Sequence, residues 1–580
     1  MANTSAMDAA SDTNNFLALG GSFNLYMAYG GSSFAFWAGA NGGGTSYSAD
    51  IQSYDYDAPI AEGGGHGYGA DGDKYSAIRT VLAYWADGPL PAEPPAPAVT
   101  AYGAVPLGSF APLDAPGALA ALVPGGPLKA ARATNMEALN ISRGWALYRT
   151  AAPVTARAQA RVAVAAVSDL ALVRCVDAAS GAVAPVGWFW RPNVTPLTAP
   201  PGACTAPSYV DVLLEDYAHI NYSHGMDDDV KGFRGLTVDG QGLDAAAWQV
   251  YPLELRYSDG WPARLPWTAT PAGAASAPAF YRGTLAIAGA PTDTYLATCG
   301  WGHGAVWING FELGRYWDPQ GPQHTLYVPA PVLRTGNNEV LLWEANATAG
   351  ATVHFVAAPD FTGAGCKALL GGAAAAAAPP AVVLDARAAA AGVRRGLSHA
   401  EARAAASMEH GAWLRSRQSP PSRRLAAAAT AAACGAPAAG TNLTLQDCAT
   451  VGAAAQWTLV PPAPGIVGAG RFQAAADASL CIGVLGTNPD TGSPNLAAVP
   501  CVAPGSRAQD WITFPDNGHK LMSALSGAFM DVPNSDSNPG ARLETYANNG
   551  GYDNQRFVWD AAAGTLTSGL ASNLCVAVCA

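Results

Sequence analysis

The feature that most restricts the fold is a threefold repeat near the end of the chain. Gln456-Trp457, Gln509-Asp510-Trp511 and Gln555-Arg556-Phe557 each close a segment of about fifty residues. A repeat of that period indicates a symmetric array of small β units, because a single unit cannot bury its apolar face alone. We therefore expect residues 425–580 to form one domain of three similar β units.

Composition and charge narrow the class of protein. Charged residues make up 13% of the 580 residues, and the formal net charge is −12. Negative charge disfavours nucleic acid and anionic membranes as partners, so we expect no nucleic-acid partner. No uninterrupted apolar run reaches the length of about 18 residues that a membrane-spanning helix needs, so we expect no membrane span.

Cysteines and glycosylation sequons indicate the compartment. Late cysteines include pairs 14 and 20 residues apart (Cys434 with Cys448, Cys481 with Cys501), spacings that suit disulfides closing hairpins. Paired C-x-x-C motifs are absent, so no metal is expected. Several Asn-x-Ser/Thr sequons favour a secreted glycoprotein, with chance matches as the alternative: Asn3, Asn140, Asn193, Asn221, Asn346 and Asn442. The chain opens on a polar segment without a signal peptide, which we expect to have been lost with an upstream part.

Residues 1–88 contain the pattern of one βα unit. Residues 22–29 alternate between an apolar face (Phe23, Leu25, Met27 and Tyr29) and a more polar one, as an inner strand of an α/β barrel does. A helix ending at Gly20-Gly21 is expected before it, and a second helix over 73–86 after it. The second helix would bury Tyr75, Ile78, Leu82 and Trp85.

The middle of the chain predicts β structure. Short runs of period two indicate a first β domain over 92–265 and a second over 275–360. Asn309-Gly310 predicts a two-residue hairpin turn. Residues 361–424 are rich in alanine and arginine, which indicates a linker. The expected fold class is therefore mainly β and multidomain: the last βα unit of a (β/α)8 barrel, two β-sandwich or jelly-roll-like domains, an Ala-rich linker and the C-terminal domain.

Ordered motifs over residues 13–346 resemble glycoside hydrolase family 35 β-galactosidases. The resemblance is carried by Asn24-Leu25-Tyr26-Met27, 53–59 (Ser-Tyr-Asp-Tyr-Asp-Ala-Pro), Leu147-Tyr148-Arg149-Thr150, Phe280-Tyr281-Arg282-Gly283, 306–311 (Val-Trp-Ile-Asn-Gly-Phe) and Leu313-Gly314-Arg315-Tyr316-Trp317. It implies hydrolysis of terminal β-linked galactose without a cofactor, by two glutamates about 5 Å apart. In the family both glutamates lie upstream of the strand at 22–29, so no catalytic residue is assigned here. Tyr26 and Tyr56 are the residues that the resemblance places against galactose.

Two further expectations concern the packing of the chain, in which only one of the eight barrel strands is found. A parallel strand needs a neighbour on each edge, so residues 1–88 should pack poorly or lie loosely on the first β domain. Trp301, Trp307, Tyr316 and Trp317 are expected in the core of the second β domain rather than on a sugar platform.

Residues 425–580 are similar to a ricin-B-type lectin β-trefoil. A working repeat of that type has an early Asp, an aromatic residue, and Asn-Gln before the closing aromatic. The first two repeats lack this set, although Cys481 and Cys501 are expected to form a disulfide in the second. The third has Asp531, Asn554 and Gln555, but Glu544 at the aromatic position. Tyr546 or Tyr552 could replace the aromatic ring, and a purely structural third repeat is the alternative.

Together these patterns predict part of a β-galactosidase with a C-terminal lectin, inactive in hydrolysis as written. The expected partners are galactose-containing glycans or a cell-wall polysaccharide, on the secretory route (extracellular, cell wall, vacuole or lysosome). The alternative is a non-catalytic carbohydrate-binding or structural protein.

Overall fold

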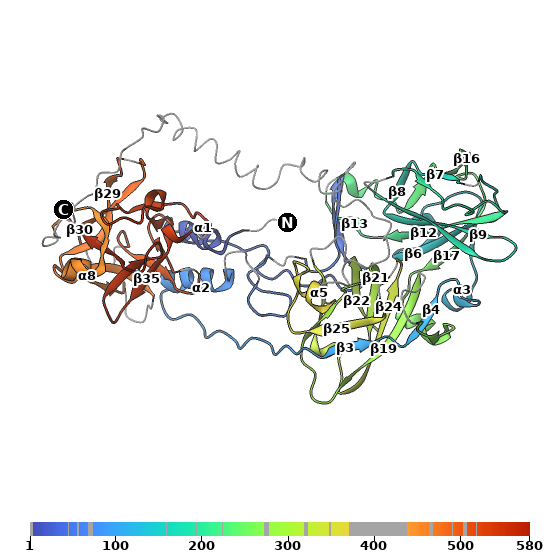
Figure 1. Cartoon of the computed structure of the whole chain (residues 1–580), viewed down its shortest axis with the longest axis horizontal. Coiled ribbons are helices and arrows are strands. Elements are labelled where there is room, and N and C mark those ends of the chain that lie inside the picture. The colour runs from blue at the N-terminus through green and yellow to red at the C-terminus, as the bar shows by residue number, and fades with distance from the viewer. Residues whose placement is uncertain are drawn as a thin grey trace. The chain divides into compact units, whose positions relative to one another are not determined.

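Two compact units make up the chain in the computed structural model. The structure describes residues 4–43, 46–54, 57–67, 73–157, 159–191, 194–222, 224–271, 278–317, 323–346, 348, 350–370, 438–462, 468–489, 491–502, 507–517, 519–550 and 552–579. One unit comprises 1–30, 55–96 and 406–580, and the other comprises 31–54 and 97–405. Both are mainly β, as expected (Figure 1).

The first β domain is organised by an antiparallel sheet of order β10-β9-β12-β6-β17-β5. In strand β6, Trp145 and Leu147 enter one apolar core, and Ala146 and Tyr148 enter another. Successive side chains point to opposite faces, so a strand that is apolar throughout is buried on both sides. The strands are β5 (Leu128–Ala130), β6 (Gly144–Thr150), β9 (Leu170–Asp177), β10 (Val183–Trp190), β12 (Ser208–Asp216) and β17 (Trp248–Leu253).

Smaller sheets cover this one, in the orders β11-β7-β15-β16, β14-β8 and β13-β1-β2. Their strands are β1 (Gly39–Gly43), β2 (Ser46–Asp50), β7 (Arg161–Ala163), β8 (Ala166–Ser168), β11 (Leu197–Thr198), β13 (His219–Ile220), β14 (Gly232–Arg234), β15 (Thr237–Val238) and β16 (Gln241–Gly242). A disulfide joins Cys175 to Cys204.

The second β domain consists of two sheets, of order β18-β4-β19-β24-β21-β22 and β23-β20-β25-β3, around one apolar core. The strands are β3 (Gly103–Pro106), β4 (Ser109–Pro112), β18 (Thr268–Ala269), β19 (Ala279–Ile287), β20 (Thr294–Ala297), β21 (His303–Ile308), β22 (Phe311–Trp317), β23 (Thr325–Val328), β24 (Gly336–Glu344) and β25 (Thr352–Val356). Residues 103–112, expected in the first β domain, therefore pair within the second. The helices of this unit are α3 (Ala118–Leu122), α4 (Trp261–Arg264) and α5 (Ala364–Leu369).

The predicted hairpin of the second β domain is confirmed. Ile308 pairs with Phe311, and Asn309 and Gly310 have φ of 51° and 82°. Both residues therefore adopt the positive φ that the two-residue turn requires. The expected core aromatics Trp301, Trp307, Tyr316 and Trp317 are all buried.

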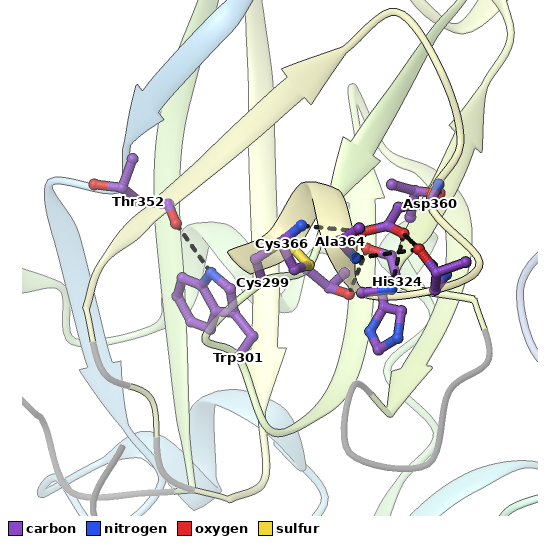
Figure 2. The surroundings of a disulfide bond; sticks show 11 residues. Cys299, Trp301, His324, Thr352, Asp360, Ala364 and Cys366 are labelled. Carbon is purple, nitrogen blue, oxygen red and sulfur yellow. Dashed lines mark hydrogen bonds between the residues drawn. A yellow bond between two sulfur atoms is a disulfide. The ribbon is translucent and has the colours of Figure 1, made fainter. Parts of the chain in front are cut away.

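A disulfide between Cys299 and Cys366 ties helix α5 to the residues after β20 (Figure 2). Asp360 Oδ2 accepts a hydrogen bond from the Cys366 amide at 3.0 Å, and Trp301 Nε1 donates to the Thr352 carbonyl at 3.0 Å. Residues 361–370, expected to begin the linker, are instead fixed to the second β domain. The rest of the predicted linker, residues 371–424, lies outside the described residues.

The repeat region, which we define as residues 438–579, shows the threefold pattern in its strands. Trp457, Trp511 and Phe557 each begin a hairpin (β27–β28, β31–β32 and β35–β36), and all three side chains share one core. Three further pairs alternate with these hairpins: β29–β30, β33–β34 and β37–β26. The last of them joins the two ends of the region.

The strands of the repeat region are β26 (Leu443–Asp447), β27 (Trp457–Val460), β28 (Ala469–Ala474), β29 (Leu480–Thr487), β30 (Pro494–Pro500), β31 (Trp511–Phe514), β32 (Lys520–Ser523), β33 (Phe529–Asp531), β34 (Glu544–Tyr546), β35 (Phe557–Asp560), β36 (Thr565–Ser568) and β37 (Leu574–Val578). Helix α8 spans Cys448–Val451. Cys481 and Cys501 form the expected disulfide, but Cys448 bonds to Cys575. The pairing of Cys448 with Cys434 was therefore wrong, because neighbouring β26 and β37 bring Cys448 and Cys575 together.

Helices α1 (Ala6–Ala18) and α2 (Lys74–Trp85) pack against the repeat region (Figure 1). Both predicted helices are confirmed, with Gly20 at φ 73° after α1 and Asp73 as the cap of α2. The strand predicted at 22–29 is wrong: only Tyr29 forms an isolated bridge, to Ile60. Leu25 is 39% exposed. An alternating pattern cannot form a barrel strand without neighbouring strands to take up its backbone hydrogen bonds.

Candidate functional site

Of the two residues expected to border a galactose pocket, the structure describes only Tyr26. Tyr26 lies in a turn and is 83% exposed, and Tyr56 lies outside the described residues. Asp57 forms an ion pair with Lys74 at 2.6 Å and accepts a hydrogen bond from the Thr4 amide at 3.0 Å. Asp57 therefore joins the segments that carry α1 and α2, which is a structural role.

The third repeat does bring its predicted polar residues together. Asp531 ends strand β33, and Asn554 lies in the single turn Asp553–Gln555 that precedes β35. Asn554 Nδ2 donates to Asp531 Oδ1 at 2.9 Å, and the Val532 amide donates to the Asn554 carbonyl at 2.9 Å. A carboxylate and an amide are thus fixed side by side, as donor and acceptor groups that could meet sugar hydroxyls.

Gln555 follows Asn554 in the chain, and its side chain forms hydrogen bonds with the loop after β34. Its Nε2 donates to the Ala547 carbonyl at 2.8 Å, and its Oε1 accepts from the Asn549 amide at 3.0 Å. Gln509 makes the equivalent bonds in the second repeat, to the Pro500 carbonyl and from the Val502 amide, both at 2.8 Å. Because Gln555 is fully buried, its part in the site is to position the loop.

Glu544 cannot act as the aromatic platform of the third repeat. It pairs with Asp531 across β33 and β34, but its carboxylate is buried and accepts hydrogen bonds from Asn488 at 2.9 Å and from Thr491. Exposed aromatic rings are nevertheless present nearby: Tyr546 is 52% exposed at the end of β34, and Tyr552 is 70% exposed. Tyr546 is two residues along the same strand from Glu544, so both side chains lie on one face of the sheet.

The environment of Asp531 alters its ionisation. Burial raises the pKa of Asp531 to about 6, and a hydrogen bond from the Gln555 side chain opposes the rise. The negative charge of Glu544 raises this pKa further, whereas Lys520 lowers it. Asp531 is therefore ionised at neutral pH and becomes protonated in mildly acidic solution.

Sequence reasoning missed Asn548 and Asn549, whose hydrogen bonds connect this site with the neighbouring segments. Asn549 Nδ2 donates to Asn554 Oδ1 at 2.7 Å. Asn548 Nδ2 donates to Ser5 Oγ at 2.8 Å and to Asp8 Oδ1 at 3.1 Å, in the first turn of α1. The Asn-Asn-Gly sequence at 548–550 signals a turn, but no sequence pattern connects that turn with residues more than 500 positions earlier.

The first and second repeats lack the Asp-Asn pair. Gly483 stands where the second repeat would need Asp, and a Cβ atom there would lie 2.5 Å from Val499 Cγ2. Ala455 and Ala508 stand where Asn is needed. Only the third repeat therefore has this polar set among the three.

Comparisons with known proteins agree with the N-terminal and central motifs. Residues 1–84 match the sequence model of glycosyl hydrolases family 35, and residues 278–338 match that of the galactose-binding domain of β-galactosidase. A β-galactosidase of Pongo abelii is 36% identical over 342 residues, which cover 56% of this chain and 47% of the relative. Beta-galactosidase 17 of Arabidopsis thaliana is 30% identical over 362 residues (59% and 50%). The chain thus spans about half the length of the curated relatives it matches.

Among solved structures, a designed threefold-symmetric protein named ThreeFoil matches 17% of this chain and 66% of its own length. Its identity is 26% and its TM-score is 0.14.

Proposed function

We propose that this chain binds galactose-containing glycans and is related to family 35 β-galactosidases, with a ricin-B-type lectin β-trefoil as its C-terminal repeat region. The observation that carries the proposal is the Asp531–Asn554 pair, joined at 2.9 Å, with Asp531 on the same face of the β33–β34 pair as the exposed Tyr546. In this proposal Asp531 and Asn554 hydrogen-bond sugar hydroxyls, and Tyr546 stacks against the apolar face of the pyranose. Gln555 positions the loop that follows Tyr546.

The proposed lectin can be tested by retention on galactose resin. Asp531→Ala removes the carboxylate, and we expect retention to be lost, with at least a tenfold weaker Kd. Asp477→Ala is the matched control, because this half-buried aspartate of the second repeat caps only a local turn at Ser479. Retention of both variants like that of the wild type would contradict a sugar site in the third repeat and favour a purely structural region.

The hydrolytic function of the relatives is a separate question. Retaining hydrolysis of a β-galactoside requires two carboxylates about 5 Å apart. Residues 1–84, the part that matches the hydrolase family, contain one glutamate, Glu62. The Glu62 carbonyl accepts a hydrogen bond from the Tyr29 hydroxyl at 3.0 Å. We infer that the 580 residues bind galactosides without hydrolysing them.

Release of the phenol from an aryl β-galactoside tests this inference. We expect the purified 580-residue chain to show no turnover above buffer, while the same preparation is retained by galactose resin. A full-length family 35 enzyme assayed in parallel shows that the aryl β-galactoside can be hydrolysed under the assay conditions. Turnover by the 580-residue chain would overturn the inference that it does not hydrolyse galactosides. The lectin proposal would be unaffected, because retention on galactose resin tests it separately.

The disulfides support a secretory location for the protein. Cys175–Cys204, Cys299–Cys366, Cys448–Cys575 and Cys481–Cys501 are spread over both units. Disulfides of this kind persist in oxidising compartments and are rare in the cytosol. We place the protein on the secretory route, where its glycan partners would be found. None of the helices in the described part of the chain has both the length and the hydropathy needed to cross a bilayer.

A further inference from the structure

A polar cavity of about 560 Å³ opens on the second β domain, and none of the residues of the candidate site in the repeat region lines it. Its wall includes Ser109, Arg282, Arg334, Asn337 and Glu339. A cavity of this volume falls within the range of about 300–1,000 Å³ in which proteins hold small ligands.

The register of three neighbouring strands explains why polar side chains gather there. Ser109 of β4 lies opposite Arg282 of β19, and Thr284 of β19 lies opposite Glu339 of β24. Residues directly opposite each other in an antiparallel pair project from the same face of the sheet. On the same face, Phe280 enters an apolar core. On this face of the sheet, the polar side chains that line the cavity therefore begin where the apolar core ends.

Arg282 is held in place by an aromatic ring, and no carboxylate among the described residues pairs with it. Its guanidinium lies over the ring of Trp267, 4.3 Å from the ring centroid, and the Trp267 Nε1 donates to the Pro262 carbonyl at 2.7 Å. The stacked guanidinium keeps its N–H edge available, because stacking occupies only its face. Arg282 is thus prepared to donate hydrogen bonds into the cavity.

Arg334 brings a second cation to the same cavity. Its Nε donates to the Asn337 carbonyl at 2.9 Å, which fixes the head group near the start of β24. Within the described residues, neither Arg282 nor Arg334 forms an ion pair with a carboxylate. Two such guanidiniums on the wall of one cavity, in a chain of net charge −12, indicate a ligand that carries an oxyanion.

Glu339 supplies a hydrogen-bond acceptor among the residues that line the cavity. Its Oε2 accepts a hydrogen bond from the Tyr257 hydroxyl at 2.7 Å, which orients the carboxylate. Its other oxygen can accept hydrogen bonds from hydroxyl groups, as can the side-chain amide of Asn337. The cavity therefore combines an oxyanion site with groups that recognise hydroxyls.

We propose that this cavity binds a pyranose that carries an oxyanion, either the carboxylate of a uronic acid or a sulfate ester. Arg282 and Arg334 bind the oxyanion, and Glu339 and Asn337 bind ring hydroxyls. The site is separate from the Asp531 site of the repeat region, and its ligand differs from a neutral galactoside in carrying a negative charge.

Calorimetric titration of the full chain tests the proposal. The protein carries Asp531→Ala, so that binding in the repeat region does not contribute. The ligands are methyl galacturonide, galactose 6-sulfate, methyl galactoside and inorganic sulfate. We expect one or both anionic sugars to bind at least tenfold more tightly than the neutral galactoside. The relative affinities of the two anionic sugars show whether the cavity prefers a carboxylate or a sulfate ester.

Substitutions assign the binding to the cavity. Arg282→Gln and Arg334→Gln should each weaken binding of the anionic sugar at least tenfold, whereas Arg132→Gln, an equal change of charge at an exposed position, should leave it unchanged. Arg334 is exposed, so its variant remains informative if Arg282→Gln does not fold. Wild-type binding by the Arg334 variant would overturn the proposal. So would displacement of the sugar by an equal concentration of inorganic sulfate.

Discussion

The carboxyl group of Asp531 is buried, and burial decides at which pH it can take part in sugar binding. An ionised carboxylate makes stronger hydrogen bonds to hydroxyl groups than a protonated one. The pKa of Asp531 is raised to about 6 by burial, so the group loses its charge within the range of acidic secretory compartments.

We expect the affinity for galactose to fall as the pH is lowered from about 7.5 to 5, with a midpoint near the pKa of about 6. The sign follows because the sugar binds the ionised form, so protonation competes with binding. Titration calorimetry at half-unit pH steps measures the profile. Asp531→Asn, which keeps the shape and cannot ionise, should bind weakly at every pH without this dependence. A flat wild-type profile would contradict the role given to Asp531.

The raised pKa of Asp531 also affects folding stability, and the pH dependence of stability is opposite to that of sugar binding. The folded state holds the Asp531 proton more tightly than the unfolded state, whose pKa is near the ordinary value of 3.8. The contribution of Asp531 to stability is therefore present at low pH and is lost as the pH rises through about 6. Sugar binding and folding stability place opposite demands on this residue, as is common at functional sites.

The predictability of the site also differs from residue to residue. Asp531, Asn554 and Gln555 could be singled out because they stand at fixed offsets from the closing Phe557. Burial of Gln555 and of Glu544 could not be foreseen, because it depends on partners in other strands, such as Asn488 for Glu544. Offsets within a repeat are local information, whereas burial is set by contacts between distant segments.

At the scale of elements, helices α1 and α2, which lie in the segment matched by the family 35 model, belong to the same compact unit as the repeat region. Ala10 of α1 and Val81 and Tyr84 of α2 share an apolar core with Ile512 and Met522 of β31 and β32. The Tyr84 hydroxyl donates to Asp510 Oδ2 at 2.7 Å. The outer face of these strands is therefore apolar because two helices cover it.

We expect Ile512→Ala to lower the free energy of unfolding of this unit by about 2–4 kcal/mol, because the residue is fully buried beneath α2. Val484→Ala is the control: Val484 is 51% exposed, and its change should stay within about 0.5 kcal/mol. Urea unfolding followed by tryptophan fluorescence measures both values. Hydrogen exchange should show faster exchange in α1 and α2 for Ile512→Ala alone. An equal loss of stability in both variants would contradict helix docking at Ile512.

The helices show where the sequence was informative and where it was not. Helix α2 was expected over 73–86 and spans Lys74–Trp85, because its cap Asp73 and its apolar spacing are local signals. Its buried residues include Ile78, as expected, together with Ala77, Val81 and Tyr84, whereas the expected Tyr75, Leu82 and Trp85 are only partly buried. A helix with apolar residues on several sides is oriented by the surfaces it meets, which here are α1 and the strands β31 and β32 more than 400 residues away.

At the scale of the whole molecule, residues that match one family segment are divided between two units. Residues 1–30 and 55–84 lie in the unit of the repeat region, whereas 31–54 lie with the two β domains. Each unit has its own apolar cores, which are made of different residues. Unfolding of one unit therefore need not expose the core of the other.

We expect calorimetry to show two thermal transitions, each sensitive to a different ligand. A ligand at a hundred times its Kd stabilises the unit that binds it by about 2.7 kcal/mol, which corresponds to roughly 5–10 °C for a unit of this size. Galactose should raise only the transition temperature of the unit that contains the repeat region, and Asp531→Ala should abolish that rise. The anionic sugar proposed for the Arg282 cavity should shift only the other transition. A single transition raised by both ligands would show that the units unfold together, because binding to one would then stabilise the whole chain.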